Sequence, residues 1–215
     1  MWGALAVLLF ATLALAAEPY RATSTHPFDD VPKWSKRFDD PQRDAWQKPD
    51  ETVAALAITK GMTVADLGAG TGYFSKRLSQ AVGETGTVFA VDVEPNLVVH
   101  LRDRAEREKT KNVIPVLASF DDPRLPARAV DLVFMLDTFH HLDHRLGYLK
   151  HLRTRLRDGG RIAVIDWKEG ELDEGPPPDH KIARGTVVKE MTDAGYELVA
   201  EPAIGLPYHF FLVFR

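Results

Sequence analysis

A glycine-rich loop flanked by acidic residues is the first feature of the sequence that could bind a ligand. The segment Asp66–Gly72 (DLGAGTG) follows an apolar run and precedes a helical pattern. Glycines at such a junction allow a tight turn and let the backbone approach a ligand closely. Asp92 ends the next apolar run, twenty residues after Gly72, where a carboxylate can accept two hydrogen bonds from a ribose diol. Together these residues predict a nucleoside site.

The glycine spacing and the position of Asp66 indicate which nucleoside this site would bind. A dinucleotide fingerprint reads G-x-G-x-x-G, and its helix points at a pyrophosphate. The present loop reads G-x-G-x-G, and Asp66 stands two residues before the first glycine. A carboxylate there disfavours an anion and favours a ligand that carries an ammonium and a sulfonium. The loop therefore favours S-adenosylmethionine over NAD.

Three candidate catalytic residues, Asp137, His140 and His141, follow the apolar run 130–136. Ligands bind at the carboxyl ends of strands in open α/β sheets, and imidazole titrates near neutral pH. We expect at least one of the three to contact cofactor or acceptor, as a general base or an orienting group. Each histidine could instead cap a helix or pack in the core. With His144 the histidines also resemble a metal cluster, but we predict no metal, since methyl transfer from a sulfonium requires none.

Alternating apolar patterns predict an α/β fold that positions these residues. Strands should alternate with helices, so the sheet should be mostly parallel, with helices on both faces. The last two strands are joined by too short a turn for a helical crossover, so they should pair antiparallel. The expected strands are 63–67, 87–92, 113–117, 130–136, 161–167, 196–204 and 208–214; the expected helices are 49–60, 73–82, 96–110, 143–158 and 180–194.

The N-terminus resembles a secretory signal peptide. Residues 4–17 are small or apolar apart from Thr12, and the run ends in Ala14-Leu15-Ala16, an A-x-A cleavage pattern. We therefore expect a signal peptide at 1–17, an exported protein, and no membrane span in the mature chain. The alternatives are an uncleaved N-terminal anchor, or a misassigned start and a cytoplasmic protein.

Residues 18–48 should form an N-terminal arm, with a short helix near 40–46, ahead of a domain at 49–215. The arm carries Trp34, Trp46 and Gln47, and we expect it to close over the cofactor as a lid. Tyr73 should lie nearby. The roles of further residues at the far rim stay open: Asp166, Trp167, His180, Tyr208 and His209.

Composition limits the classes of partner and site. The 215 residues fit one domain, and 27 Lys and Arg against 31 Asp and Glu give a net charge of −4. This balance gives no electrostatic reason to expect a nucleic acid partner. The chain has no cysteine, which excludes disulfides and thiolate metal ligands.

From about Pro49 to its end the chain resembles class I S-adenosylmethionine-dependent methyltransferases. The likeness rests, in order, on the glycine loop, on 91–95 (VDVEP), on 121–126 (DDPRLP), on 130–137 (VDLVFMLD) and on 156–162 (LRDGGRI). It implies a Rossmann-like seven-stranded sheet of order 3-2-1-4-5-7-6, with strand seven antiparallel. The cofactor-binding residues it implies are Asp66, Gly68, Ala69, Gly70, Thr71, Gly72, Asp92, Val93, Asp121 and Leu136.

The resemblance implies methyl transfer by in-line displacement to a small-molecule or protein acceptor. Residues 46–49 and 139–142 are similar to a bacterial methyltransferase subgroup, but this likeness does not indicate the acceptor. The alternatives are a protein that binds S-adenosylmethionine without transferring its methyl group, and an NAD-dependent oxidoreductase.

Overall fold

A seven-stranded sheet forms the centre of the computed structural model, which describes residues 20–24 and 28–215. The predicted signal peptide at 1–17 lies outside the described residues. The strand order is β3-β2-β1-β4-β5-β7-β6, and β7 runs antiparallel to both β5 and β6. The predicted fold class and strand order are confirmed. The strands are β1 Thr63–Leu67, β2 Thr87–Asp92, β3 Val113–Leu117, β4 Val130–Leu136, β5 Leu156–Trp167, β6 Leu198–Ala200 and β7 His209–Phe214.

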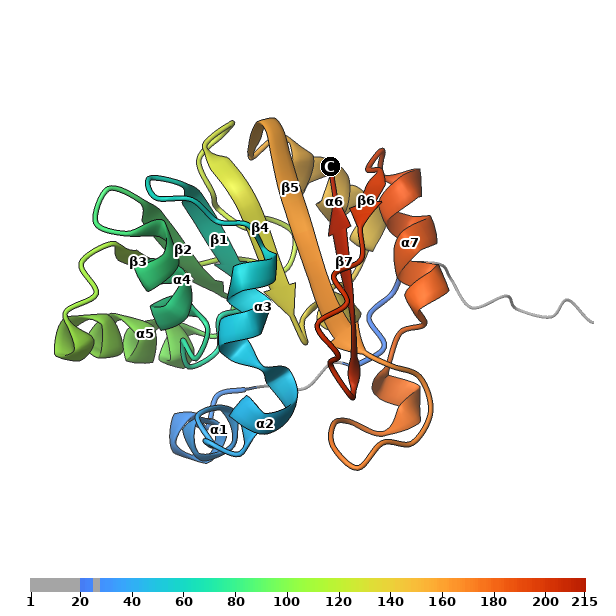
Figure 1. The fold of residues 1–215 in the computed structure, drawn as a ribbon, viewed down its shortest axis with the longest axis horizontal. Helices are drawn as coiled ribbons and strands as arrows, with labels where there is room; N and C mark the ends of the chain where they lie inside the picture. Colours follow the sequence, from blue (N-terminus) through green and yellow to red (C-terminus); the bar gives the residue numbers. More distant parts are fainter. Residues whose placement is uncertain (1–19, 25–27) are drawn as a thin grey trace, which may run out of the picture.

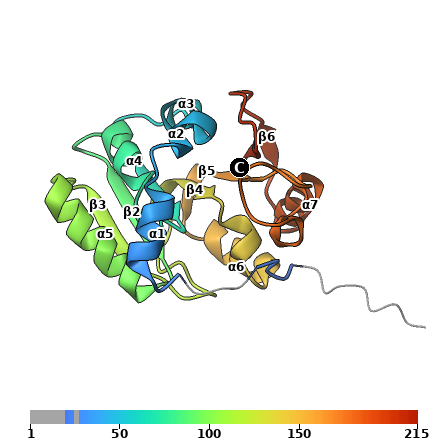
Figure 2. The same cartoon turned by 90° about the horizontal axis from the view of Figure 1, so that it is seen from below.

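Helices cover both faces of the sheet because strand side chains alternate between two apolar cores. On one face, α3 (Pro49–Ala55) and α4 (Ser75–Val82) pack on residues such as Val64 and Phe134. On the other face, α6 (Arg145–Arg153) and α7 (Arg184–Asp193) pack on residues such as Val133 and Val164. The helix α5 (Pro95–Glu108) places Leu101 against Ala90 of β2. Figures 1 and 2 show this layered arrangement.

The predicted helix 143–158 is wrong at its C-terminal end. The helix α6 ends at Arg153, and Leu156 already pairs with Val130 as the first residue of β5. The turn at 159–160 therefore lies within an extended, irregular strand and does not end a helix. A Cβ on Gly160 would lie 2.9 Å from the carbonyl oxygen of Arg157, so the chain is tightly folded there. The leucine spacing suited a helix, but pairing with β4 determines the local structure.

Other boundaries also differ from the prediction. The helix α5 begins at Pro95, with Glu94 at its N-cap, and ends at Glu108, whereas 96–110 was expected. The strand β6 is shorter than the predicted 196–204, and α7 begins at Arg184, after a short 3₁₀ turn at Pro178–His180. The arm contains an unpredicted helix, α1 (Val31–Phe38), capped by the Asp30 side chain.

The N-terminal arm runs along the edge of the sheet where the parallel strands end. There α1 and α2 (Arg43–Gln47) lie beyond the carboxyl ends of the strands (Figures 1 and 2). At the other end of this edge, the carbonyl of Tyr20 accepts a hydrogen bond from the N–H of Arg145. Within residues 20–24 and 28–215, no helix is both long and apolar enough to cross a bilayer.

Candidate functional site

The glycine loop adopts a backbone conformation that its glycines make possible. Gly68, Gly70 and Gly72 have φ values of 76°, 57° and 89°, in the left-handed region that glycine adopts without strain. A Cβ on Gly68 would lie 2.3 Å from Oγ1 of Thr138, just after β4. The loop after β1 therefore packs directly against the turn after β4. A side chain at Gly68 would force the two apart.

Two buried carboxylates flank this loop. Asp66 is 3% exposed and accepts a 2.6 Å hydrogen bond from Ser75 Oγ. Burial raises the pKa of Asp66 to about 7, and the charge of Asp92 adds to the effect. Asp92 accepts hydrogen bonds from the N–H groups of Gly70 and Glu94, and burial raises its pKa as well. Two acids in one buried region fit a ligand that brings positive charge and hydroxyl donors.

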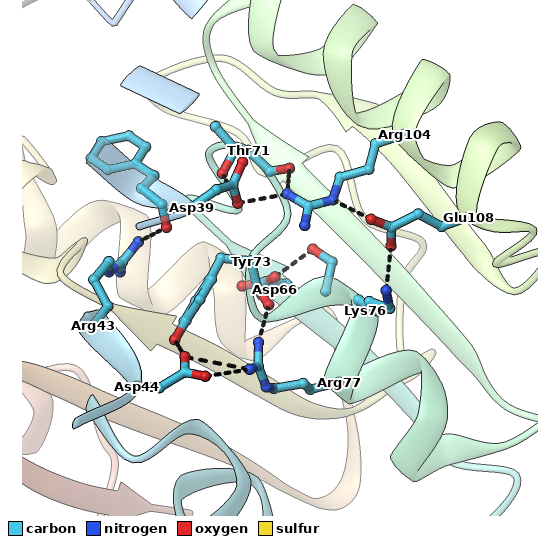
Figure 3. Close-up of polar contacts among 12 residues, drawn as sticks. Asp39, Arg43, Asp44, Asp66, Thr71, Tyr73, Lys76, Arg77, Arg104 and Glu108 are labelled. Carbon is cyan, nitrogen blue, oxygen red and sulfur yellow. Dashed lines mark hydrogen bonds and ion pairs between the residues drawn. The ribbon is translucent and has the colours of Figure 1, made fainter. Parts of the chain in front are cut away.

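The arm is joined to the glycine loop through Asp39, which follows α1. Its Oδ1 accepts hydrogen bonds from Thr71 Oγ1 at 3.0 Å and from Arg104 Nη1 at 2.7 Å, and the same Arg104 nitrogen donates to the Thr71 carbonyl (Figure 3). The ring of Phe38 lies 3.4 Å from where a Cβ on Gly70 would be. The end of α1 is therefore seated on the loop predicted to bind the cofactor.

A second group of contacts holds α2 to the residues after the loop. Asp44 accepts a short hydrogen bond from the Tyr73 hydroxyl and forms an ion pair with Arg77 (Figure 3). The Arg43 guanidinium lies over the Tyr73 ring, 4.5 Å from its centroid, and donates to the Phe38 carbonyl. Burial raises the pKa of the Tyr73 hydroxyl and lowers that of Arg43. The predicted lid segment thus covers this edge of the sheet, with charged contacts on both sides of the loop.

Asp137 is the predicted catalytic residue that lies beside the glycine loop and under the arm. It follows β4 with φ 54°, an unusual conformation for a residue with a side chain. Its Oδ2 accepts from Gln47 Nε2 at 3.0 Å, and its Oδ1 lies 2.8 Å from His209 Nε2. The Trp167 and His209 rings are 4.1 Å apart, and Trp46 stacks parallel to His209 at 5.7 Å. Asp137 therefore borders an aromatic cluster formed by Trp46, Trp167, Tyr208 and His209.

His140 lies on the face of the sheet that α6 and α7 cover, and its side chain pairs with Asp166 and not with Asp137. Its Nδ1 is 2.8 Å from Oδ1 of Asp166, and its backbone N–H donates to the other oxygen. Burial lowers the pKa of His140, but the Asp166 charge outweighs this, so the pKa is raised. Burial raises and His140 lowers the pKa of Asp166, with a net decrease. The carbonyl of His140 accepts from Thr23 N–H, so this pair also supports the N-terminal segment.

The other predicted residues are more dispersed. His141 bonds the Ser24 carbonyl through Nδ1 and packs edge-on against Phe28 of the arm. His144 is exposed, and the described part of the chain holds no group of three metal-ligating side chains. Asp121 is exposed, and a hydrogen bond from Ser119 lowers its pKa. The predicted cofactor contacts Ala69, Val93 and Leu136 are buried or half-buried near the ends of β1, β2 and β4. In the arm, the Trp34 ring stacks on Phe38. The carbonyl of His180 accepts a hydrogen bond from the Thr23 hydroxyl.

Sequence reasoning did not find the contacts of Gln47 and His209 with Asp137, or that of Asp166 with His140. The sequence indicates Gln47 only as part of the lid and indicates no role for His209 or Asp166. Asp137 and His209 are 72 residues apart in the chain. Position at the start of the last strand was the one available signal for His209, since an antiparallel β7 must begin at the edge where the parallel strands end.

Comparison with known proteins places these features in context. A family described as "Methyltransferase domain" matches residues 64–160. A crystal structure of an S-adenosylmethionine-dependent methyltransferase from Aquifex aeolicus is 33% identical, with a TM-score of 0.81, over 86% of this chain and 97% of that chain. Among curated proteins, the ubiquinone/menaquinone biosynthesis C-methyltransferases UbiE of Cupriavidus metallidurans and Pseudoalteromonas translucida are each 27% identical, over 55% and 59% of this chain. The chain spans about half the length of these curated relatives, 48% and 50%.

Proposed function

The chain belongs to the S-adenosylmethionine-dependent methyltransferases, and from that premise we propose that it methylates the hydroxyl group of a small aromatic acceptor. S-adenosylmethionine is accordingly the methyl donor, as the glycine spacing predicted. The acceptor binds between the arm and the turn after β4.

The residues around the glycine loop fit the donor. The tight loop depends on its glycines, because a Cβ on Gly68 or Gly72 would collide with Thr138 or Leu101, and the loop presents backbone without large side chains. The Asp92 carboxylate can accept from a ribose diol, and the buried Asp66 suits a nearby cationic group. When bound, the donor supplies an electrophilic methyl group on a positively charged sulfur.

The aromatic cluster beside Asp137 is the observation that carries the acceptor proposal. Trp46 and Tyr208 are half-buried, Trp167 is buried, and their rings lie within 6 Å of at least one neighbour in the cluster. Flat rings around a single carboxylate favour a flat acceptor with a polar edge. The names of the curated relatives refer to quinone biosynthesis, which agrees with an aromatic acceptor, but they specify transfer to carbon; the choice of a hydroxyl rests on the aromatic cluster and its carboxylate.

The position of the arm supports a small acceptor. Contacts of Asp39 and Asp44 seat α1 and α2 over the ends of the strands, so the acceptor must fit beneath them. Enclosure of this kind excludes water from a displacement reaction and aligns the two reactants. Export of the mature chain stays a prediction, since the segment that carries it lies outside the described residues.

A panel of acceptors tests this function. The purified protein is incubated with isotopically labelled S-adenosylmethionine and, separately, with phenols, catechols, hydroquinones, aliphatic alcohols, amines and a protein extract. We expect S-adenosylhomocysteine and a labelled O-methyl product with the aromatic hydroxyl compounds. The variant Asp92→Asn serves as a control for transfer at this site, and its rate should fall with every acceptor. Transfer confined to amines, aliphatic alcohols or protein, or to a ring carbon of the aromatic compounds, would overturn the proposal.

A further inference from the structure

A buried ring nitrogen of His209 has no hydrogen-bond partner among the described residues. The His209 side chain is 0% exposed, and its Nε2 lies 2.8 Å from the Asp137 carboxylate. A carboxylate can only accept, so Nε2 carries the hydrogen and Nδ1 of the neutral ring keeps its lone pair. That Nδ1 is the unpartnered atom. An unpaired buried acceptor costs about 1–3 kcal/mol, so a donor from a ligand is expected there.

Gln47 has the same feature on the other side of the carboxylate. Its amide nitrogen donates to Asp137, and its Oε1 is buried without a partner in the described part of the chain. Gln47 belongs to α2, Asp137 follows β4 and His209 begins β7, so three elements converge on one carboxylate. Two buried acceptors without donors therefore flank the group that borders the proposed acceptor site.

The charged and aromatic surroundings suit a proton acceptor. Among the described residues, Arg43 of α2 interacts electrostatically with Asp137, and the Lys168 ammonium donates to the carbonyls of Leu206 and Pro207, just before β7. The rings of Trp46 and Trp167 pack on His209 and keep water away. A proton gained at Nδ1 would create an imidazolium directly opposite the Asp137 carboxylate, which stabilises it.

We propose that His209 takes up the proton of the hydroxyl group that receives the methyl, with Asp137 as its ionic partner and Gln47 as a positioning residue. This inference rests on the proposed function. The acceptor hydroxyl gives its proton to Nδ1 of His209, and the electron pair of the O–H bond stays on oxygen. An oxygen pair then forms the bond to the methyl carbon, while the pair of the broken carbon–sulfur bond stays on sulfur. The proton leaves Nδ1 for solvent when the product departs.

Phenols of graded acidity test the proton transfer. The variant His209→Gln retains an amide that can donate to Asp137 but has no proton acceptor. With phenol or catechol, we expect kcat/KM to fall roughly 100-fold or more relative to the native chain. With 4-nitrophenol at pH 8, which is already ionised, the loss should stay under about tenfold. The matched control is His144→Gln, because His144 is exposed and outside the site; it should retain its rate with both acceptors.

Equal losses with both kinds of phenol would show that His209 only positions other groups and would overturn the inference. Unchanged rates in His209→Gln would do the same. If the native chain methylates no phenol, the proposed function fails. The tautomer of His209 beside Asp137 can then still be measured without any methyl acceptor.

Nitrogen-15 NMR of the histidine rings gives a readout that needs no acceptor. When its ring is neutral, His209 should carry hydrogen on Nε2 and none on Nδ1, in the free protein and with S-adenosylhomocysteine bound. The variant Asp137→Asn should lose this single-tautomer signature, and Gln47→Met should weaken it while the chain stays folded. A neutral ring that carries its hydrogen on Nδ1 would contradict the proposal, because that nitrogen could then accept no proton.

Discussion

At the scale of single residues, the two ends of the site differ in the burial and the partners of their carboxylates. Asp66 and Asp92 lie beside the glycine loop with raised pKa values, whereas Asp137 is 21% exposed and bonded to His209. The first pair suits a cationic donor, and the second group suits the release of a proton from an acceptor. One edge of the sheet thus combines electrostatic binding with acid–base chemistry.

The raised pKa of Asp66 predicts a pH-dependent stability in the absence of ligand. The folded chain keeps a proton on Asp66 up to about pH 7 because burial disfavours the charge, while the unfolded chain releases it near pH 4. The folded state binds more protons in this window, so its stability falls as pH rises from about 4 to 7. Asp66→Asn removes this term and keeps an acceptor for Ser75. The comparison uses the free energy of unfolding of the variant minus that of the native chain. This difference should be up to about 4 kcal/mol more favourable to the variant above pH 7 than at pH 4.

Urea unfolding of both proteins at several pH values measures this difference. The variant Asp131→Asn is a matched control, because Asp131 is only partly buried and pairs with Arg157 at the other end of the sheet. Curves for the native chain and Asp66→Asn that stay parallel from pH 4 to 8 would contradict the prediction.

At the scale of elements, the arm completes the site, and its seating depends on a few polar contacts. Asp39 accepts from both Thr71 and Arg104 and is only partly exposed. Hydrogen bonds to charged groups typically contribute about 1.5–3 kcal/mol, and partial exposure lowers that value. Replacing Asp39 by Asn should therefore weaken S-adenosylhomocysteine binding roughly tenfold, or about 1.4 kcal/mol. It should also speed hydrogen exchange across α1.

The neighbouring residue offers a close control for this prediction. Among the described residues, the side chain of Asp40 accepts just a local hydrogen bond from the Gln42 N–H, so Asp40→Asn should leave affinity and exchange nearly unchanged. Calorimetry gives the affinity and mass spectrometry the exchange. Equal behaviour of the two variants would mean that Asp39 does not hold the arm in place.

Local patterns were sufficient to predict some elements and insufficient for others. The runs at 63–67, 87–92, 113–117 and 130–136 form strands with the predicted bounds. Short apolar runs are typical of parallel strands, and β3 at 113–117 keeps this pattern although it lies at the edge of the sheet and is partly exposed. The α6–β5 boundary depends on the pairing of Leu156 with Val130, which helical spacing cannot reveal. The glycine loop and Asp92 could be read from spacing. The Asp137–His209 contact could not, because it depends on the register of β7 against β5.

At the scale of the whole molecule, the N-terminal segment connects the two faces of the sheet. Residues 20–24 contact α6, the turn after β4 and the 3₁₀ turn before α7, and residues 28–48 cross the glycine loop toward α3. Arg145 of α6 lies at the start of this path. It donates to the Arg21 carbonyl and pairs with Glu190 of α7. This ion pair therefore joins both helices of one face to the start of the arm.

Breaking the Arg145–Glu190 pair should destabilise the fold without altering the donor site. Both side chains are at most 5% exposed, and Arg145 Nη2 lies 3.1 Å from Glu190 Oε1. Glu190→Ala would leave a buried guanidinium without its counter-charge, which typically costs about 3–5 kcal/mol. The exposed pair Arg128–Asp158 is the control, and Asp158→Ala should cost less than about 1 kcal/mol. Urea unfolding measures both changes.

The double variant Arg145→Met, Glu190→Leu should recover much of the lost stability, because no buried charge remains. A cost below 1 kcal/mol for Glu190→Ala would show that water reaches this pair and that it does not join the two helices.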